Sequence, residues 1–183
     1  ATAMYLGQQH LNVLVLDSEP SIGQGSNKAA IGGIRATHSN VAKVLLCLDS
    51  IEELSTWKDR YQEDIEWVQG GYTFVAYEET TKQALQNIVK EQKPLNTGLR
   101  WLEKEELVKH IPSLNTEGLL GGTFAEKDGS ASPLLTINAF YQHAIAANVE
   151  FRFNEPVIDV LVKNHKVTGV KTFQGQYNAH IVI

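Results

Sequence analysis

Hydrophobic and polar positions divide the beginning of the chain into a short helix and a buried strand. Residues 1–9 have helix-compatible apolar spacing, and the Val- and Leu-rich run at 10–18, HLNVLVLDS, predicts a strand. A helix that leads into a continuous apolar strand is the second half of a βαβ unit. We therefore expect the first strand of that unit to precede Ala1.

Two longer amphipathic helices are predicted further along the chain. Apolar residues at three- and four-residue spacing predict one helix from Asn40 to near Tyr61, with Ser39 or Asn40 as its N-cap. The other begins with Ser132 as its cap and Pro133 in its first turn, where a missing N–H is tolerated. Both helices have an apolar face that must be buried against other elements.

The stretch between these helices predicts a hairpin and two further helices. Residues 65–77 have the pattern of two strands that flank a turn at Gly70-Gly71. Thr80 and Gln83 have the spacing of a capping box at the start of the next helix. A short helix is expected over 103–111, where Pro112 ends it.

Short strands dominate the C-terminal part. The runs VEFRF, VIDVLVKN, KVTGVKTFQG and NAHIVI predict strands over 149–153, 157–164, 166–175 and 178–183. Because no cap or turn follows the last run, we expect the fold to continue beyond Ile183. The βαβ pattern near the N-terminus, with the helices and strands that follow, predicts an α/β fold.

Composition and charge exclude several kinds of partner. The 183 residues are 43% hydrophobic with a net charge of −5, and their scattered basic residues form no patch for nucleic acid or anionic lipid. No apolar run approaches the roughly 20 residues that cross a bilayer, and no signal-peptide pattern is present. The single cysteine, Cys47, fits a reducing compartment. We expect a soluble, cytoplasmic protein.

The first strand ends at an acid and is followed by a run rich in glycine and serine. Asp17, at the carboxyl end of a parallel strand, can accept hydrogen bonds from the hydroxyls of an adenosine ribose, or it can be a solvated turn residue. The next run, SIGQGSNKAAIGGIR at 21–35, has glycines that let the backbone approach a flat or anionic ligand. It is too apolar for a solvated linker, and it ends in one charge, Arg35.

Two segments carry a family resemblance: LNVLVLDSEPSIGQGSNKAAIGGIRATHS, and DGSASPLLTINAFYQHAIAANVEFRFNEPVIDVLVKNHKVTGVKTFQGQYNAHIVI. They resemble the FAD-dependent amine and amino-acid oxidoreductases of the D-amino-acid oxidase superfamily, nearest to the sarcosine oxidase beta-subunit and the glycine or proline oxidase branches. Members carry a GxGxxG turn before the position of Ala1 and a further half after Ile183. The resemblance thus implies a chain that is incomplete at both ends.

The resemblance also assigns cofactor and substrate roles. It implies an FAD-binding part at 1–69, a substrate-side part at 70–132, and a continued FAD-binding part at 133–183. The implied FAD-binding parts form a Rossmann-like parallel sheet with helices, and the substrate-side part interrupts it as an antiparallel α+β insertion. The implied cofactor contacts are Asp17 at the ribose, Ser18 and Val157 at the adenine, Ser26 and Asn27 near the pyrophosphate, and Ala30, Ile31, Gly32 and Gly33 along the flavin. Arg35 matches an arginine that holds the substrate carboxylate in some members, which suits its planar fork. Many relatives have Arg-Asn where this chain has Ala29-Ala30.

Other side chains have simpler structural explanations. The six histidines show no i, i+4 pair and no cysteine partner, so we expect no metal site. His38 either faces the flavin cavity or belongs to a loop, and Tyr72 and Phe74 either floor a substrate pocket or alternate in a strand. Asp128-Gly129 is a turn signal with no catalytic role.

Three functional hypotheses follow. The first is an FAD-dependent oxidoreductase that oxidises the C–N bond of a small amine or amino acid by hydride transfer to flavin, with no obligatory acid/base pair. The second is a non-catalytic fragment or subunit of such an enzyme that does not bind FAD by itself, with a partner subunit or a second copy completing it. The third, a nicotinamide-dependent dehydrogenase, leaves the Gly/Ser loop and GGIR without a role.

Overall fold

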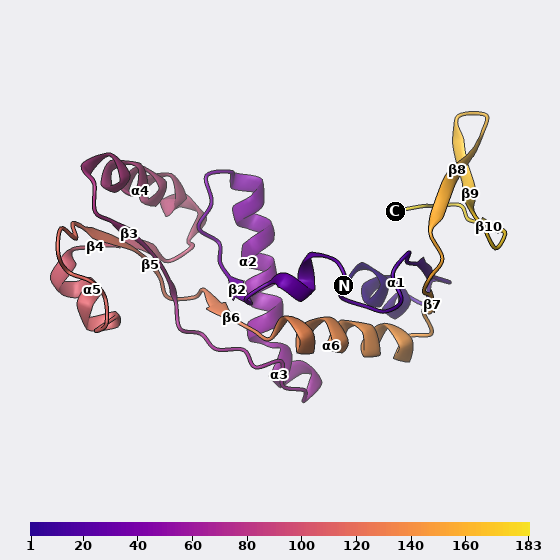
Figure 1. Ribbon diagram of the computed structural model, residues 1–183, viewed down its shortest axis with the longest axis horizontal. Coiled ribbons are helices and arrows are strands. Elements are labelled where there is room, and N and C mark those ends of the chain that lie inside the picture. The colour runs from indigo at the N-terminus through magenta and orange to yellow at the C-terminus, as the bar shows by residue number, and fades with distance from the viewer. The chain divides into compact units, whose positions relative to one another are not determined.

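A computed structural model describes all residues, 1–183, and divides them into two compact units. The first unit contains Ala1–Ala30 and Pro133–Ile183, and the second contains Ile31–Ser132. Helices are interspersed with strands through most of the chain, and its C-terminal part contains strands alone (Figure 1). The predicted α/β class is confirmed, because a parallel strand pair lies in the first unit and an antiparallel sheet in the second. The division into FAD-binding and substrate-side parts stays a prediction.

A parallel strand pair joins the two ends of the first unit. β1 (Leu14–Leu16) pairs in parallel with β7 (Glu150–Arg152), and α1 (Thr2–Gln8) packs against α6 (Pro133–Ala146) beside it. Gly7 allows this close packing, since a Cβ there would lie 2.7 Å from the Val149 side chain. The helix predicted at the N-terminus, the strand after it and the helix starting at Pro133 are confirmed.

A three-stranded antiparallel sheet completes the first unit. It consists of β8 (Val157–Lys163), β9 (Lys166–Thr172) and β10 (Gln176–Asn178), in the order β10-β9-β8. The turn at Asn164-His165 uses positive φ at both residues, as a two-residue hairpin requires. Two of the predicted C-terminal strands therefore form this hairpin.

A second antiparallel sheet forms the centre of the second unit. β5 (Gly121–Ala125) lies between β3 (Tyr72–Ala76) and β4 (Leu99–Leu102), and every residue of β5 is buried. Figure 1 shows α4 (Glu79–Gln92) on one side of this sheet and α5 (Lys104–His110) on the other. The core on the α5 side contains Leu102, Leu107, Leu119 and Phe124. η2 (Lys93–Leu95) connects α4 to β4.

Apart from β6, the remaining elements of the second unit lie before β3 in the chain. β2 (Gly33–Ile34) pairs with β6 (Gly129–Ser130), and Asn40 caps α2 (Val41–Ser55) by accepting from the Lys43 amide at 3.1 Å. The helix expected to run to Tyr61 is broken after Ser55, and α3 (Trp57–Tyr61) follows. The break coincides with the Thr56 hydroxyl donating to the Glu52 carbonyl at 2.7 Å, a bond that competes with regular helix geometry.

The hairpin expected at Gly70-Gly71 is wrong. Val68 forms a bridge with Ser130, while β3 pairs with β5 instead of with the preceding residues. Gly71, at φ +75°, donates its amide to the Asp128 carbonyl at 2.9 Å. The glycines therefore carry the chain from one pairing partner to another, a difference that long-range pairing decides.

Two smaller expectations are also wrong. The α4 helix begins with Glu78 as its extended N-cap residue and without a side-chain cap, so Thr80 and Gln83 form no capping box. No strand forms over 178–183 beyond the end of β10, and Ile181 and Ile183 are exposed. A strand needs a partner for its backbone groups, and after the Ala179 amide, which donates to the Thr168 carbonyl at 3.0 Å, no strand of this chain pairs with the run.

The central strand β5 generates a stability prediction. Gly121 has φ +134°, and a Cβ there would lie 2.5 Å from the Leu102 carbonyl oxygen. Gly121→Ala should therefore lower the free energy of unfolding by about 3 kcal/mol, through backbone strain and a steric clash. Gly70→Ala is the matched control, because a Cβ there meets nothing within 4 Å. Urea unfolding checks both variants, and equal losses would contradict the prediction.

Candidate functional site

The Asp17 turn lies directly after β1 in the first unit. The Asp17 amide donates to the Arg152 carbonyl at 2.9 Å, and the Glu155 amide donates to the Asp17 carbonyl at 2.8 Å. The Asp17 Oδ1 atom accepts from the Glu19 amide at 2.9 Å. These bonds hold the carboxylate at the carboxyl end of a parallel strand, and Oδ2 remains for a ligand.

The residue that bonds the Asp17 carbonyl, Glu155, has a buried carboxylate. Glu155 is only 2% exposed, and its Oε1 accepts from the Thr172 hydroxyl at 2.9 Å and from the Tyr177 hydroxyl. Ser18, beside Asp17, is exposed, and Val157 is the first residue of β8, with its side chain partly exposed. The structure therefore brings Asp17 and the β7–β8 connection, which leads into Val157, together through backbone bonds.

The Gly/Ser run is folded and anchored to α6. Ser26 begins η1 (Ser26–Ala29), and the Asn27 side-chain amide donates to the Pro133 carbonyl at 3.0 Å. Gly23, at φ +72°, lies against Ile137. Ser26 and Ala30 are exposed, so the anchored loop presents a small hydroxyl and a methyl group to solvent.

The GGIR segment belongs to the second unit. Gly32, at φ +85°, accepts from the Ala131 amide through its carbonyl at 3.1 Å, and Gly33 pairs with Ser130. A Cβ at Gly33 would lie 3.2 Å from the Tyr72 ring, so this position favours glycine. Ile31 is 95% exposed, an apolar side chain held out from an ordered backbone.

Arg35 lies over two aromatic rings of the same unit. Its guanidinium carbon is 4.9 Å from the Phe74 ring centre and 5.7 Å from that of Tyr72. Its Nη1 donates to the Thr37 carbonyl and lies 3.5 Å from His38 Nδ1. Tyr72 and Phe74 share one face of β3 because strand residues alternate. Cation–π attraction therefore holds the guanidinium while its Nε and Nη2 remain unpaired within the chain.

His38 is held as part of the same loop. The Gln92 side-chain amide donates to the His38 carbonyl at 2.7 Å. Burial, together with the positive charges of Arg35 and Lys43, lowers the pKa of His38, so the ring is neutral at pH 7. The neutral ring adds no second cation beside Arg35. Whether it faces the flavin stays a prediction.

Asp128 is a buried carboxylate that the sequence assigned to a plain turn. It is 1% exposed, its Oδ1 accepts from the Ala36 amide at 3.2 Å, and its Oδ2 has no partner. Burial raises its pKa to about 6, although the Ala36 amide and the Arg35 charge act in the opposite direction. Its only sequence signal is the Asp128-Gly129 pair, which local turn chemistry explains fully.

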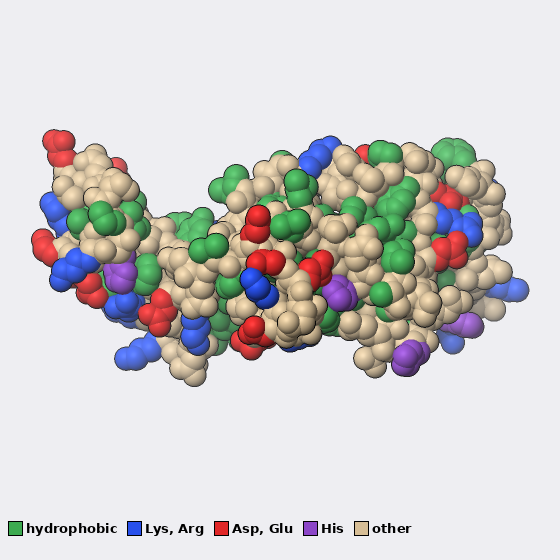
Figure 2. Space-filling view, turned by 90° about the horizontal axis from the view of Figure 1, so that it is seen from below, with side chains coloured by type: hydrophobic (Ala, Val, Ile, Leu, Met, Phe, Trp, Pro, Cys, Tyr) green, Lys and Arg blue, Asp and Glu red, His purple; other side chains and the backbone are tan.

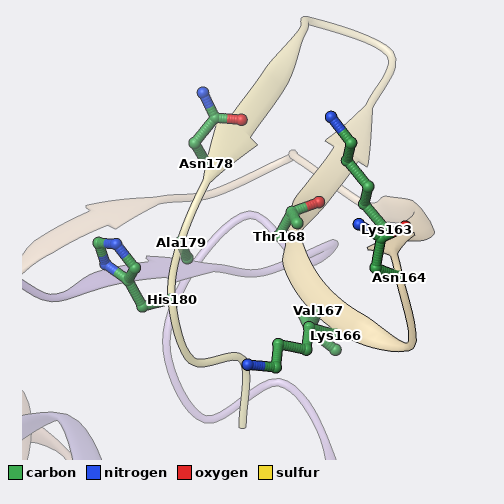
Figure 3. Close-up of a pocket in the computed structure, with 8 residues that line it drawn as sticks. All are labelled: Lys163, Asn164, Lys166, Val167, Thr168, Asn178, Ala179 and His180. Atoms are coloured by element: carbon green, nitrogen blue, oxygen red, sulfur yellow. The ribbon is translucent and has the colours of Figure 1, made fainter.

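A separate hollow of about 810 Å³ lies on the β8–β10 sheet. Figure 3 shows Lys163 and Lys166 at its hairpin side and His180 on the segment after β10. None of the predicted site residues lines it. On the face shown in Figure 2, basic side chains are interspersed with acidic ones instead of forming a continuous patch.

Two comparisons relate this chain to known proteins. The DAO family model, described as FAD dependent oxidoreductase, matches residues 1–183. The chain belongs to this family. A curated relative, "FAD-dependent oxidoreductase domain-containing protein 1" of Xenopus laevis, is 26% identical over 148 residues, or 76% of this chain and 29% of that protein. The chain thus spans less than a third of this DAO relative.

Solved structures have the same fold. L-proline dehydrogenase from P. horikoshii matches with a TM-score of 0.89 at 23% identity, over 98% of this chain and 47% of that one. Glycine oxidase from Bacillus cereus matches with a TM-score of 0.76 at 23% identity, over 97% and 50%. L-amino acid deaminase from Proteus myxofaciens matches with a TM-score of 0.85 at 18% identity, over 98% and 41%. The chain resembles about half of each structure.

The residues present fit the FAD on which DAO-family proteins depend. Asp17 offers an oriented acceptor for ribose hydroxyls, and a Cβ at Gly25 would meet nothing within 4 Å, which leaves open space beside the loop backbone. No group of three or more His, Cys, Asp or Glu side chains is placed to hold a metal ion. None of the helices combines the length and apolarity required to cross a membrane.

The raised pKa of Asp128 predicts a pH-dependent stability. The pKa of Asp128 is about 6 in the folded protein and near 3.8 in the unfolded chain, so the folded protein binds the Asp128 proton more tightly. The contribution of this proton to the free energy of unfolding is complete below pH 3.8 and is lost as the pH rises through about 6. About two pKa units correspond to roughly 3 kcal/mol. Because asparagine does not ionise, the free energy of unfolding of Asp128→Asn should rise relative to wild type by up to that amount between pH 4 and 7.

Urea unfolding at a series of pH values measures this difference. Asp49→Asn, at an exposed position on α2, serves as the matched control and should track the wild type. A stability difference between Asp128→Asn and wild type that stays constant across the range would contradict the prediction.

Proposed function

We propose that the protein carrying this chain is an FAD-dependent oxidoreductase that oxidises the carbon–nitrogen bond of a small amine or amino acid. The observation that carries this proposal is Arg35, a cation held over the Phe74 and Tyr72 rings with donors unpaired. Three structural neighbours, L-proline dehydrogenase, glycine oxidase and L-amino acid deaminase, are named for amino acids. Sarcosine, glycine and proline belong to the substrate class that we propose.

When bound, FAD would supply the hydride acceptor that this oxidation requires, as the C–N single bond of the substrate becomes a C=N bond. A neutral amine forms the C=N bond with its nitrogen lone pair as the hydride leaves, which gives an iminium, so this step needs no protein base. The chain's own contribution is to bind and orient the cofactor and the substrate. This division of labour agrees with a site that holds no paired acid and base beside Arg35.

Separate parts of the chain are proposed to hold the cofactor. Asp17 binds the adenosine ribose through its carboxylate, because its position is fixed by backbone bonds and by the Glu19 amide. The remaining contacts in this proposal are Ser18 and Val157 at the adenine, Ser26 and Asn27 near the pyrophosphate, and Ala30, Ile31, Gly32 and Gly33 along the flavin. Asn27 acts mainly by anchoring its loop to Pro133.

Arg35 is proposed to bind the substrate carboxylate. A guanidinium can form two parallel hydrogen bonds with a carboxylate, and Nη2 and Nε of Arg35 are free within the chain to form them. The Phe74 and Tyr72 rings limit how the guanidinium plane can turn. Residues Tyr72 and Phe74 thereby also border the proposed substrate position.

The 183-residue chain itself tests whether this part of the protein binds FAD. Titration of FAD with the purified chain should quench flavin fluorescence. Denaturation of the complex should then release flavin that absorbs at about 450 nm. A chain that stays colourless and leaves FAD fluorescence unchanged would favour the hypothesis of a non-catalytic fragment.

Asp17→Asn tests the ribose contact. The variant keeps an acceptor for the Glu19 amide and loses the charge, so the turn is retained while hydrogen bonds from ribose weaken. We expect the Kd for FAD to rise about tenfold, the range for hydrogen bonds to charged groups. Fluorescence titration measures the Kd, and Asp49→Asn should leave it unchanged. An Asp17→Asn variant with wild-type affinity would rule out the ribose role.

Arg35→Ala tests the carboxylate contact in the FAD-loaded protein. KM for an amino acid should rise about 50-fold, while KM for the corresponding amine without a carboxylate should change less than threefold. Arg35→Lys should recover only part of the loss, because an ammonium lacks the planar fork. Steady-state kinetics with the two substrates provides the measurement. Equal effects on both substrates would show that Arg35 does not bind the carboxylate.

A further inference from the structure

Two acidic residues are buried in this structure, and they differ in how they are satisfied. Glu155 accepts from the hydroxyls of Thr172 and Tyr177. Asp128 accepts only from the Ala36 amide, and its second oxygen is buried without a partner. Burying an unpaired carboxylate oxygen is costly, so a role for Asp128 beyond a turn has to be sought in what its bonds connect.

The bonds of Asp128 join three segments of the second unit. Its side chain holds the Ala36 amide, directly after Arg35 in the chain. Its carbonyl accepts from the Gly71 amide at 2.9 Å, directly before Tyr72. Its own amide donates to the Ala125 carbonyl at 3.2 Å, at the end of the central strand β5. One residue therefore links the backbone that carries Arg35 to the strand that carries the aromatic rings beneath it.

We propose that Asp128 is a positioning residue for Arg35, acting through its bond to the Ala36 amide. The bond fixes the backbone one residue after Arg35, and the Gly71 bond fixes the first residue of the aromatic face. Together they set where the guanidinium lies over Tyr72 and Phe74. The proposal rests on the proposed role of Arg35 in binding a substrate carboxylate.

The charges around Asp128 predict that substrate affinity depends on pH. Arg35 is the charged side chain that acts on the Asp128 carboxylate, and His38 and Tyr72 are the titratable groups that adjoin Arg35. An ionised Asp128 places a negative charge near the guanidinium that is to bind the substrate carboxylate. Since burial raises the pKa of Asp128 to about 6, affinity for a carboxylate substrate should fall as the pH rises through that value.

Asp128→Ala and Asp128→Asn separate positioning from general destabilisation. Asp128→Ala removes the acceptor for the Ala36 amide, and we expect KM for an amino acid to rise about fivefold, the scale of one hydrogen bond. Asp128→Asn keeps an acceptor at the Oδ1 position, so its KM should stay within twofold of wild type while the pH step near about 6 disappears. KM for the amine lacking a carboxylate should change in neither variant.

A double-mutant cycle with Arg35→Ala tests whether Asp128 acts through Arg35. If it does, Asp128→Ala should not raise KM further once Arg35 is absent. An undiminished effect in that background, or equal losses in the Asn and Ala variants, would overturn the proposal. Asp49→Asn is the control for removing a carboxylate elsewhere in the same unit.

An NMR measurement keeps the inference testable apart from the proposed function. The Ala36 amide proton should titrate with an apparent pKa of about 6 in wild type and not in Asp128→Asn, whatever the substrate is. If Arg35→Ala leaves KM unchanged, Arg35 does not bind the substrate carboxylate.

The positioning role of Asp128 is then tested separately by the NMR resonance of the Arg35 Nε–H group. The chemical shift of that resonance should change in Asp128→Ala and should return to the wild-type value in Asp128→Asn. An unshifted resonance in the Ala variant would overturn the positioning role.

Discussion

The parallel pairing of β1 with β7 is the constraint on which the first unit depends. It joins residues more than a hundred positions apart in the sequence and matches Leu14 with Glu150 and Leu16 with Arg152. The same pairing continues into the Asp17 turn, whose amide is bonded to Arg152 at the end of β7 and whose carbonyl is bonded to Glu155 in the β7–β8 connection. A carboxylate at the end of a lone strand would have no fixed direction, whereas this one is held by backbone groups on both sides.

The second unit uses a different means to hold a charge. Arg35 is placed by aromatic faces, and the backbone on either side of that contact is held by Asp128. Cation–π attraction is weakly directional, so backbone bonds have to supply the position that the rings do not. A buried carboxylate with one unpaired oxygen makes this arrangement sensitive to pH.

Membership of the DAO family and the local geometry support different parts of the functional interpretation. The family match covers residues 1–183 and carries the dependence on FAD. The likeness to solved structures, at 23% identity or less for the three described, shows the fold. The substrate class rests on Arg35 and its surroundings, and the kinetics of its variants decide it. The chain spans about half of the length of those structures.

Sequence patterns alone were enough to predict where most helices lie and which family the chain resembles. Apolar periodicity located α1, α2, α4, α5 and α6, and the acid-ended strand with its Gly/Ser loop and GGIR located the residues now proposed to hold FAD. These features depend on neighbours within a few residues, so spacing alone reveals them.

Only the tertiary structure decided which segments pair and which acid is buried. The hairpin at Gly70-Gly71 failed because Val68 pairs with Ser130 and β3 pairs with β5, and these partners lie far away in the sequence. The sequence around Asp128 predicts only a turn, whereas the fold buries its side chain and bonds it to the Ala36 amide. Strand pairing and burial are properties of distant contacts, and a pattern of neighbouring residues does not contain them.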